Sequence, residues 1–210
     1  MARREREYPG DTFRLLYAIG EYTKPREGEP GQRWLKEQAV SVIVTLGVKG
    51  AVFRTYDLAP SLIMFRGVKM FAMMSQEALG DVAKLYQDGM IEKSRINTSF
   101  YATIRAYRIT RAGLDLVKRN LSRGSMEGID RIIRCEACGT LVDFALSEEA
   151  WPQRRLAMNR VCACTAKGQH TDSGRWPPTH DGAQASVVED FFSIGFLEYR
   201  AEAFWGDCGI

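Results

Sequence analysis

The sequence predicts an α+β fold in two parts, and three observations lead to that prediction. Apolar residues recur at helical spacing in several segments. A polar turn separates two strand-like segments, the second of them rich in aromatic and β-branched residues, which is typical of a β-hairpin. Four cysteines follow in two close pairs, Cys135 with Cys138 and Cys162 with Cys164, and mark a second part with its own chemistry.

Length and composition fit a globular protein. With 210 residues, 45% of them apolar and 26% charged, the chain has the size of one large domain or two small ones. The charged start has no apolar stretch behind it that would make a signal peptide, and the longest nearly uncharged apolar run, residues 39–48, is about half a membrane span. We therefore expect a cytoplasmic protein, in which paired cysteines more often bind metal or carry out redox chemistry than form disulfides.

The net charge of +3 hides an uneven distribution. Residues 1–134 carry 23 Lys and Arg against 15 Asp and Glu, whereas residues 135–210 carry 6 against 11. A basic front attracts the phosphates of nucleic acid, and an acidic back indicates a different partner. The alternative is a charged surface that only keeps the protein soluble.

The first elements are a polar segment and a helix. Residues 1–33 are rich in turn formers and predict an arm with one brief helix over residues 13–19. A helix is expected over residues 33–46, where apolar residues recur at helical spacing, with Gly47 and Gly50 ending it.

The middle of the chain predicts a short strand and two helices. The strand covers residues 52–56, and Asp57 caps a helix through Leu58, Leu62 and Phe65. Residues 68–74 are apolar and ambiguous. Ser75 caps the next helix, which runs to residue 88, ends at Gly89 and has its inner face at Leu79, Val82 and Tyr86.

A hairpin and a helix complete the first part. Residues 90–94 and 100–109 predict two strands around the polar turn at Asn97, Thr98 and Ser99. Thr110 then caps a helix whose inner face is Leu114, Val117 and Leu121.

This order resembles the winged helix-turn-helix of MarR-like and PadR-like regulators. The resemblance lies in residues 85–93, LYQDGMIEK, and in residues 107–113, YRITRAG, and it covers roughly residues 33–120. In those families a recognition helix ends at a leucine, a glycine and an isoleucine, a wing follows, and a threonine caps the next helix. The resemblance implies a polar arm over residues 1–33, a winged-helix domain over residues 34–124, and a cysteine-rich, acidic and aromatic module over residues 125–210.

The resemblance also implies a surface for double-stranded DNA. The exposed face of the recognition helix would present Gln76, Gly80, Ala83, Lys84 and Gln87, of which the two glutamines suit adenine edges and the lysine suits a phosphate or guanine. Glu77 and Asp81 on the same helix would repel phosphate. The wing adds basic and polar residues: Lys93, Arg95, Asn97, Thr98, Ser99 and Arg105, with Arg66 and Lys69 as further backbone contacts.

The four cysteines predict a zinc site. Cys135 and Cys138 have the spacing of a zinc knuckle followed by Gly139, and Cys162 with Cys164 is a tighter pair that still chelates. Four thiolates would close the coordination sphere of a structural zinc, and His170 or His180 is an alternative fourth ligand. A dithiol redox role for the first pair is the other reading, although it would leave the second pair without a task.

The sequence therefore predicts a fold of the α+β class, a winged helix-turn-helix domain with a small zinc-bound C-terminal module, and a DNA-binding regulator rather than an enzyme. No phosphate-binding glycine loop, metalloprotease motif or nucleophile elbow occurs in the chain. The alternatives are a protein-interaction subunit of a transcription or replication assembly, and a cysteine-dependent redox protein. The aromatic segment over residues 185–205 is expected to pack on the rest of the chain or to join two copies into a dimer.

Overall fold

The computed structural model describes residues 8–25, 33–65, 68–96, 104–136, 138–148 and 156–161. The elements in these ranges are α1 (Gly10–Thr23), β1 (Leu35–Lys36), α2 (Glu37–Lys49), β2 (Ala59–Phe65), β3 (Val68–Met74), α3 (Gln76–Gln87), β4 (Ile91–Ile96), β5 (Ile104–Ile109), α4 (Arg111–Asn120), α5 (Arg123–Ile133), β6 (Asp143–Glu148) and β7 (Leu156–Val161). Helices pack with a small antiparallel sheet, so the predicted α+β class is confirmed. No helix among the described residues is long and apolar enough to cross a membrane.

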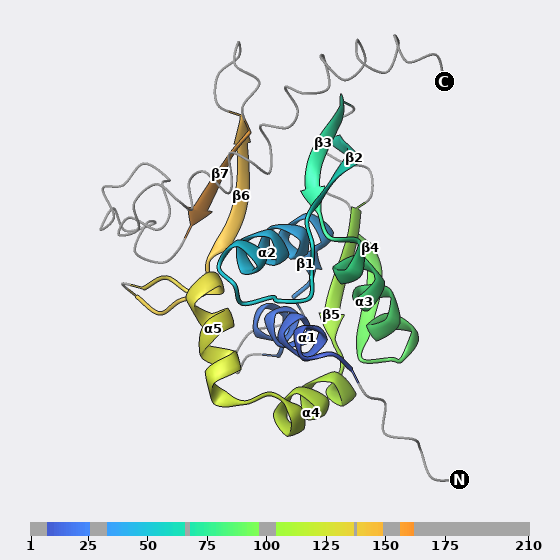
Figure 1. Cartoon of the computed structure of the whole chain (residues 1–210), viewed down its shortest axis with the longest axis vertical. Coiled ribbons are helices and arrows are strands. Elements are labelled where there is room, and N and C mark those ends of the chain that lie inside the picture. Colours follow the sequence, from blue (N-terminus) through green and yellow to red (C-terminus); the bar gives the residue numbers. More distant parts are fainter. Residues whose placement is uncertain are drawn as a thin grey trace.

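Helix α1 is the centre of the fold, and the prediction of a polar arm over residues 1–33 is wrong for this segment. Leu15, Leu16 and Ile19 are fully buried, and the helix contacts α2, α3, α4, α5 and β5. Figure 1 shows α1 surrounded by these elements. The brief helix expected over residues 13–19 is real but longer, because the apolar face continues between flanking turn formers.

A three-stranded antiparallel sheet in the order β1-β5-β4 lies against α1. The predicted hairpin is confirmed as β4 and β5, which pair from Ile91 with Ile109 to Ile96 with Ile104. Strand β1 adds two residues through the pairing of Leu35 with Tyr107. The residues of β1 were expected to lie in the helix over residues 33–46, because a two-residue strand carries no periodic signal.

The second helix is confirmed as α2, although it starts and ends later than predicted. Gly47 does not end it. A side chain at Gly47 would place its Cβ 2.2 Å from the ring of Phe53, so the glycine lets the loop after α2 fold back onto the helix. Gly50 is the residue that caps the C-terminus, with its amide donating to the Leu46 carbonyl.

Residues 51–74 depart from the predictions. The expected strand at residues 52–56 is irregular, because the amides of Arg54 and Thr55 donate to the side chain of Asp11 instead of to another strand. The helix expected after Asp57 is wrong: β2 pairs with β3 along its full length, from Ala59 with Met74 to Phe65 with Val68. Short apolar runs do not distinguish a buried helix from a strand.

Helix α5 was not predicted. Its buried residues Ile129, Ile132 and Ile133 belong to the same core as α1 and α2. The boundary expected between residues 124 and 125 therefore falls inside a helix of the first part. After α5 the chain turns through Cys135 and enters the β6–β7 hairpin, which Figure 1 shows projecting from the helical body.

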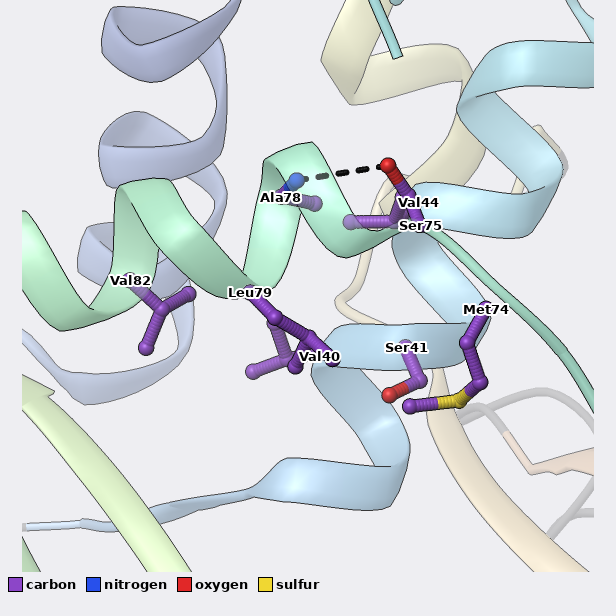
Figure 2. A pocket seen from close by; sticks show the side chains of 8 residues that line it. All are labelled: Val40, Ser41, Val44, Met74, Ser75, Ala78, Leu79 and Val82. Carbon is purple, nitrogen blue, oxygen red and sulfur yellow. Dashed lines mark hydrogen bonds between the residues drawn. The ribbon is translucent and has the colours of Figure 1, made fainter. Parts of the chain in front are cut away.

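Helices α2 and α3 meet around a shallow apolar hollow. Figure 2 shows side chains from both helices and from the end of β3 pointing toward it. Its lining residues are Val40, Ser41, Val44, Met74, Ser75, Ala78, Leu79 and Val82. The hollow holds no charged group, so we treat it as packing between the helices.

Candidate functional site

The orientation of α3 decides which of its residues a partner can contact. Ser75 caps the helix as predicted, with its hydroxyl accepting a hydrogen bond from the Ala78 amide at 3.2 Å. The buried face consists of Ala78, Val82 and Leu85. Tyr86, predicted to be on the inner face, lies outside with 45% of its surface exposed. Of the predicted inner residues Val82 is confirmed, whereas Ala78 and Leu85 take the buried positions that were predicted for Leu79 and Tyr86.

A polar network fixes α3 to α1. The Asp81 carboxylate accepts hydrogen bonds from the Thr12 hydroxyl at 2.5 Å and from the Tyr56 hydroxyl at 2.7 Å. Burial and the bond to Asp81 both raise the pKa of Tyr56, so this hydroxyl stays protonated and donating. The expectation that Asp81 repels phosphate is wrong, because its carboxylate faces α1 and is hydrogen-bonded there. The Tyr8 hydroxyl holds Asp88 at the other end of α3.

Asp11 anchors the loop between α2 and β2. Its Oδ2 accepts from the amides of Arg54 and Thr55 at 2.6 and 2.7 Å and from the Thr55 hydroxyl at 2.8 Å. Arg14 also contacts the carboxylate. Burial raises the pKa of Asp11, but the hydrogen bonds from Thr55, Arg14 and Arg54 outweigh it, and the net shift is downward.

The exposed face of α3 is the one expected from the sequence. The structure places these predicted residues on the exposed side of the helix: Gln76, Gly80, Ala83, Lys84 and Gln87. The Gln76 amide donates to the Ser61 hydroxyl at 3.3 Å, and the Lys84 ammonium lies 4.8 Å from the centre of the Tyr8 ring. Glu77 is exposed at the start of the helix, and its carboxylate accepts from the Ser75 hydroxyl at 2.8 Å.

The β4–β5 hairpin gathers three of the predicted basic residues on one face. Lys93 and Arg95 are two residues apart on β4, and Arg95 is paired directly with Arg105 on β5, so all three share a side of the ladder. All three side chains are exposed. Asn97, Thr98 and Ser99 lie outside the described residues, as does Arg66.

This face is turned toward α3. The Lys93 ammonium lies 4.6 Å from the centre of the Tyr86 ring, which joins the hairpin to the C-terminal end of the helix. Arg105 forms an ion pair of 3.3 Å with Glu37, and Tyr107 donates to the same carboxylate at 3.2 Å. Burial and the neighbouring Glu37 raise the pKa of Tyr107 to about 12.

Tyr86 is the residue that was assigned to the wrong face of α3. Helical spacing fits the set Leu79, Val82 and Tyr86 as well as the set Ala78, Val82 and Leu85, so the sequence does not decide between them. The structure buries the second set and leaves Tyr86 outside.

The first cysteine pair lies in a tight turn between α5 and β6. The Gly139 amide donates to the Cys135 carbonyl at 2.8 Å, and the Cys135 amide donates to the Thr140 carbonyl at 2.9 Å. Gly139 has a φ of +67°, which an L-residue rarely adopts. Cys135 is buried and Cys138 is exposed, with its sulfur 2.9 Å from the Thr140 hydroxyl.

The cysteine turn is bonded to α1. The Arg134 guanidinium contacts the buried carboxylate of Glu21, donates to Asp130 at 3.0 Å, and donates to the Gly139 carbonyl at 3.2 Å. Burial lowers the pKa of Arg134, but the neighbouring Asp130 and Glu21 raise this pKa by more, so the side chain stays charged. The Tyr22 hydroxyl donates to the Val142 carbonyl at 2.6 Å on the far side of the turn.

The second cysteine pair, Cys162 and Cys164, lies outside the described residues, as do His170, His180 and the aromatic segment over residues 185–205. Strand β7 ends at Val161, which is paired with Asp143 at the start of β6. Among the described residues no three potential ligands are close enough to hold a metal ion, and the described part contains only one of the two cysteine pairs.

A comparison with known families finds one match. The model of the Uncharacterized protein MJ1567 family matches residues 11–160, which run from the first turn of α1 to the end of β7. No curated protein matches the chain. No solved structure matches it either.

Proposed function

The chain belongs to the Uncharacterized protein MJ1567 family, and we propose that it is a winged-helix protein that binds double-stranded DNA, as a transcriptional regulator. The order α1, β1, α2, α3, β4, β5 with the sheet order β1-β5-β4 supports the resemblance to MarR-like and PadR-like regulators. In this proposal α3 is the recognition helix and the β4–β5 hairpin is the wing. The β2–β3 hairpin is an addition between the two helices that precede the wing.

One observation carries the proposal: three exposed basic side chains share the face of the hairpin that is turned toward α3. Lys93, Arg95 and Arg105 would meet phosphates while the exposed side of α3 enters the major groove. The inward position of Asp81 adds support, because it removes one negative charge from that side. Lysine and arginine contacts to phosphate supply most of the affinity of proteins for DNA.

A protein-docking role on the same surface is the second candidate. Two observations favour it: Glu77 is exposed at the start of α3, and Glu37 already neutralises part of the charge of Arg105. Both reduce the attraction for phosphate. A titration that finds no affinity for duplex DNA, while the folded protein is intact, would favour this candidate.

The cysteine turn supports a structural zinc site as part of the same proposal. The positive φ of Gly139 and the hydrogen bonds of the Cys135 and Gly139 amides to backbone carbonyls make a tight turn at the cysteine spacing of a zinc knuckle. The chain runs on from Val161 directly into Cys162, and Val161 is paired with Asp143 next to the turn. We place Cys135, Cys138, Cys162 and Cys164 as the four ligands, a closed set that leaves no position for catalysis.

The salt dependence of duplex binding tests the DNA proposal. The logarithm of the affinity should fall linearly with the logarithm of the salt concentration. Replacing both Lys93 and Arg95 by alanine should weaken binding and reduce the slope by about 2, one for each lost phosphate contact. Lys118→Ala is the matched control, since Lys118 is an exposed lysine on α4 and should change neither value.

Equal slopes for the double variant and the unchanged protein would show that the hairpin does not touch the phosphates. Circular dichroism of both proteins excludes misfolding as the cause of a loss. Since Lys93 and Arg95 are exposed, we expect the two spectra to agree.

A further inference from the structure

Tyr86 stands between α3 and the hairpin, where a partner of either element would meet it. It is the large hydrophobic side chain that the described part of the chain leaves exposed, at 45%. The Lys93 ammonium lies 4.6 Å from its ring centre, and an attraction between cation and ring of this kind holds a flexible lysine in place. The pair therefore offers an ammonium and a phenol hydroxyl close together, both donors that phosphate oxygens accept.

The hairpin extends this set of donors. Arg95 follows Lys93 on the same face at a spacing of about 6.7 Å along the strand. Arg95 and Arg105 are direct cross-strand partners, an arrangement in which like charges repel. Within the described residues Glu37 is paired with Arg105, whereas no carboxylate is paired with Arg95. An anion seated between the two guanidinium groups would relieve their repulsion.

The exposed side of α3 offers little for reading bases. The amide of Gln76 is engaged by the Ser61 hydroxyl, and the ammonium of Lys84 lies over the Tyr8 ring. Both side chains would have to give up these contacts before they reached a base edge.

The middle of that side has no polar side chain. Gly80 and Ala83 lie there, and a Cβ added at Gly80 would meet nothing within 4 Å. Besides the exposed Glu77 at the start of the helix, Gln87 is the remaining polar side chain on this side. One glutamine supplies a single bidentate contact, which is far less than the several base contacts of a sequence-specific reader.

We propose that Tyr86, Lys93, Arg95 and Arg105 form a surface that binds the sugar–phosphate backbone of duplex DNA with little discrimination between base sequences. This rests on the proposed function and narrows it: the ligand is the backbone of the duplex, and Tyr86 is a contact residue. The exposed side of α3 enters or faces the groove but reads few bases, and the β4–β5 hairpin together with Tyr86 supplies the affinity.

Selection from a random duplex library tests the low discrimination. After repeated rounds of binding, the selected pool should bind the full chain within about threefold of the starting pool, since each correctly read base would add about 1–3 kcal/mol, or about 5- to 150-fold. A selected motif that binds more than tenfold tighter overturns the inference while leaving the DNA proposal intact. Failure to bind any duplex overturns the DNA proposal itself.

Two variants on α3 test the role of Tyr86. Tyr86→Ala should weaken binding to the starting pool by about tenfold, because a hydrogen bond to a charged partner is lost and Lys93 is released. Tyr86→Phe, which keeps the ring under Lys93, should lie between this variant and the unchanged protein. Gln87→Ala tests the alternative of base contacts by α3 and should cost at most about twofold, whereas Lys118→Ala on α4 is the matched control and should leave binding unchanged.

The affinities of Tyr86→Ala and Gln87→Ala also define the result that contradicts the assignment of Tyr86 as a contact residue. Unchanged affinity of Tyr86→Ala overturns it, and so does a tenfold loss for Gln87→Ala, which would return the affinity to base contacts by α3. Thermal unfolding of each variant separates loss of binding from loss of fold. Both side chains are exposed, so we expect the melting temperatures to agree within about 2 °C.

Discussion

Single carboxylates decide much of this structure, and their roles differ with burial. Asp11 and Asp81 have the same side chain, yet Asp11 holds a loop through amide and hydroxyl donors, and Asp81 holds a helix through two hydroxyl donors. Glu77 on the outside of α3 keeps its charge in solvent. The sequence could place all three on their elements, but only the packing of α1 against α3 decides which of them face inward.

The Asp11 carboxylate makes stability depend on pH. Its pKa is lower in the folded chain than the ordinary 3.8, so its contribution is fully present above that value and is lost as pH falls through the lower folded pKa. Asp11→Asn should lower the free energy of unfolding at pH 7 by about 2 kcal/mol, because a charged acceptor of several hydrogen bonds is removed. Urea titrations at pH 7 and between pH 4 and pH 2.5 measure both effects.

Asp11→Asn should also lose less stability than the unchanged protein as pH falls below 4, since it lacks the titrating Asp11 carboxylate. Glu77→Gln is the comparison at an exposed carboxylate and should leave the value at pH 7 nearly unchanged. A parallel pH dependence of Asp11→Asn and the unchanged protein would contradict this assignment.

At the scale of elements, prediction succeeded where the signal was local. The helix capped by Ser75, the left-handed exit at Gly89, the β4–β5 hairpin and the cap at Thr110 all follow from residues adjacent in sequence. The predictions failed for strand β2 and helix α5. For β2 the reason is that an apolar run fits a helix as well as a strand, and for α5 it is that Gly124 and Gly128 weaken the helical signal. Tyr86 was assigned to the wrong face because the spacing of Leu79, Val82 and Tyr86 fits a helix as well as that of Ala78, Val82 and Leu85.

The cysteine turn is the element whose proposed chemistry can be measured directly. We expect one zinc per chain in protein purified under reducing conditions, and a zinc content well below that in Cys138→Ser. The same variant should melt about 5 °C lower or more, because metal binding contributes to folding free energy. Cys208→Ser is the matched control, since Cys208 stands apart from both pairs in the sequence and should leave zinc and melting unchanged.

Elemental analysis with differential scanning fluorimetry gives both readings from one preparation. Metal-free protein with an unchanged melting temperature in Cys138→Ser would remove the zinc proposal and leave the turn as a purely hydrogen-bonded structure.

For the whole molecule, one hydrophobic core joins α5 to α3 and to the β4–β5 hairpin, the elements that carry the proposed DNA surface. The division of the chain at residue 124 followed the extent of the winged-helix resemblance and the start of the cysteine-rich part, neither of which reports on packing. The boundary fell inside α5 because the apolar face of this helix was not recognised in the sequence. The segment over residues 185–205, with its aromatic residues, lies outside the described part and stays a prediction.

We expect that segment to join two copies of the chain. Many regulators that read DNA through a helix-turn-helix bind as dimers, because two half-sites raise the affinity. Truncation after Gln184 should convert a dimer into a monomer and should leave the folded first part intact. Light scattering measures the mass, and thermal unfolding reports on the fold. A truncated protein with the same mass and melting temperature as the full chain would show that the segment neither assembles the protein nor covers its core.

Helix α1 is bonded at both ends to different surfaces, at Thr12 to the helix proposed to face DNA and at Glu21 to the cysteine turn through Arg134. We expect both surfaces to be lost together, because opening either one would begin by detaching the same buried helix. Amide hydrogens in α1 should then exchange with solvent only when the whole core opens. Loss of the Arg134 contact at the cysteine turn and loss of the bond between Thr12 and Asp81 should therefore shorten the lifetime of the same folded state.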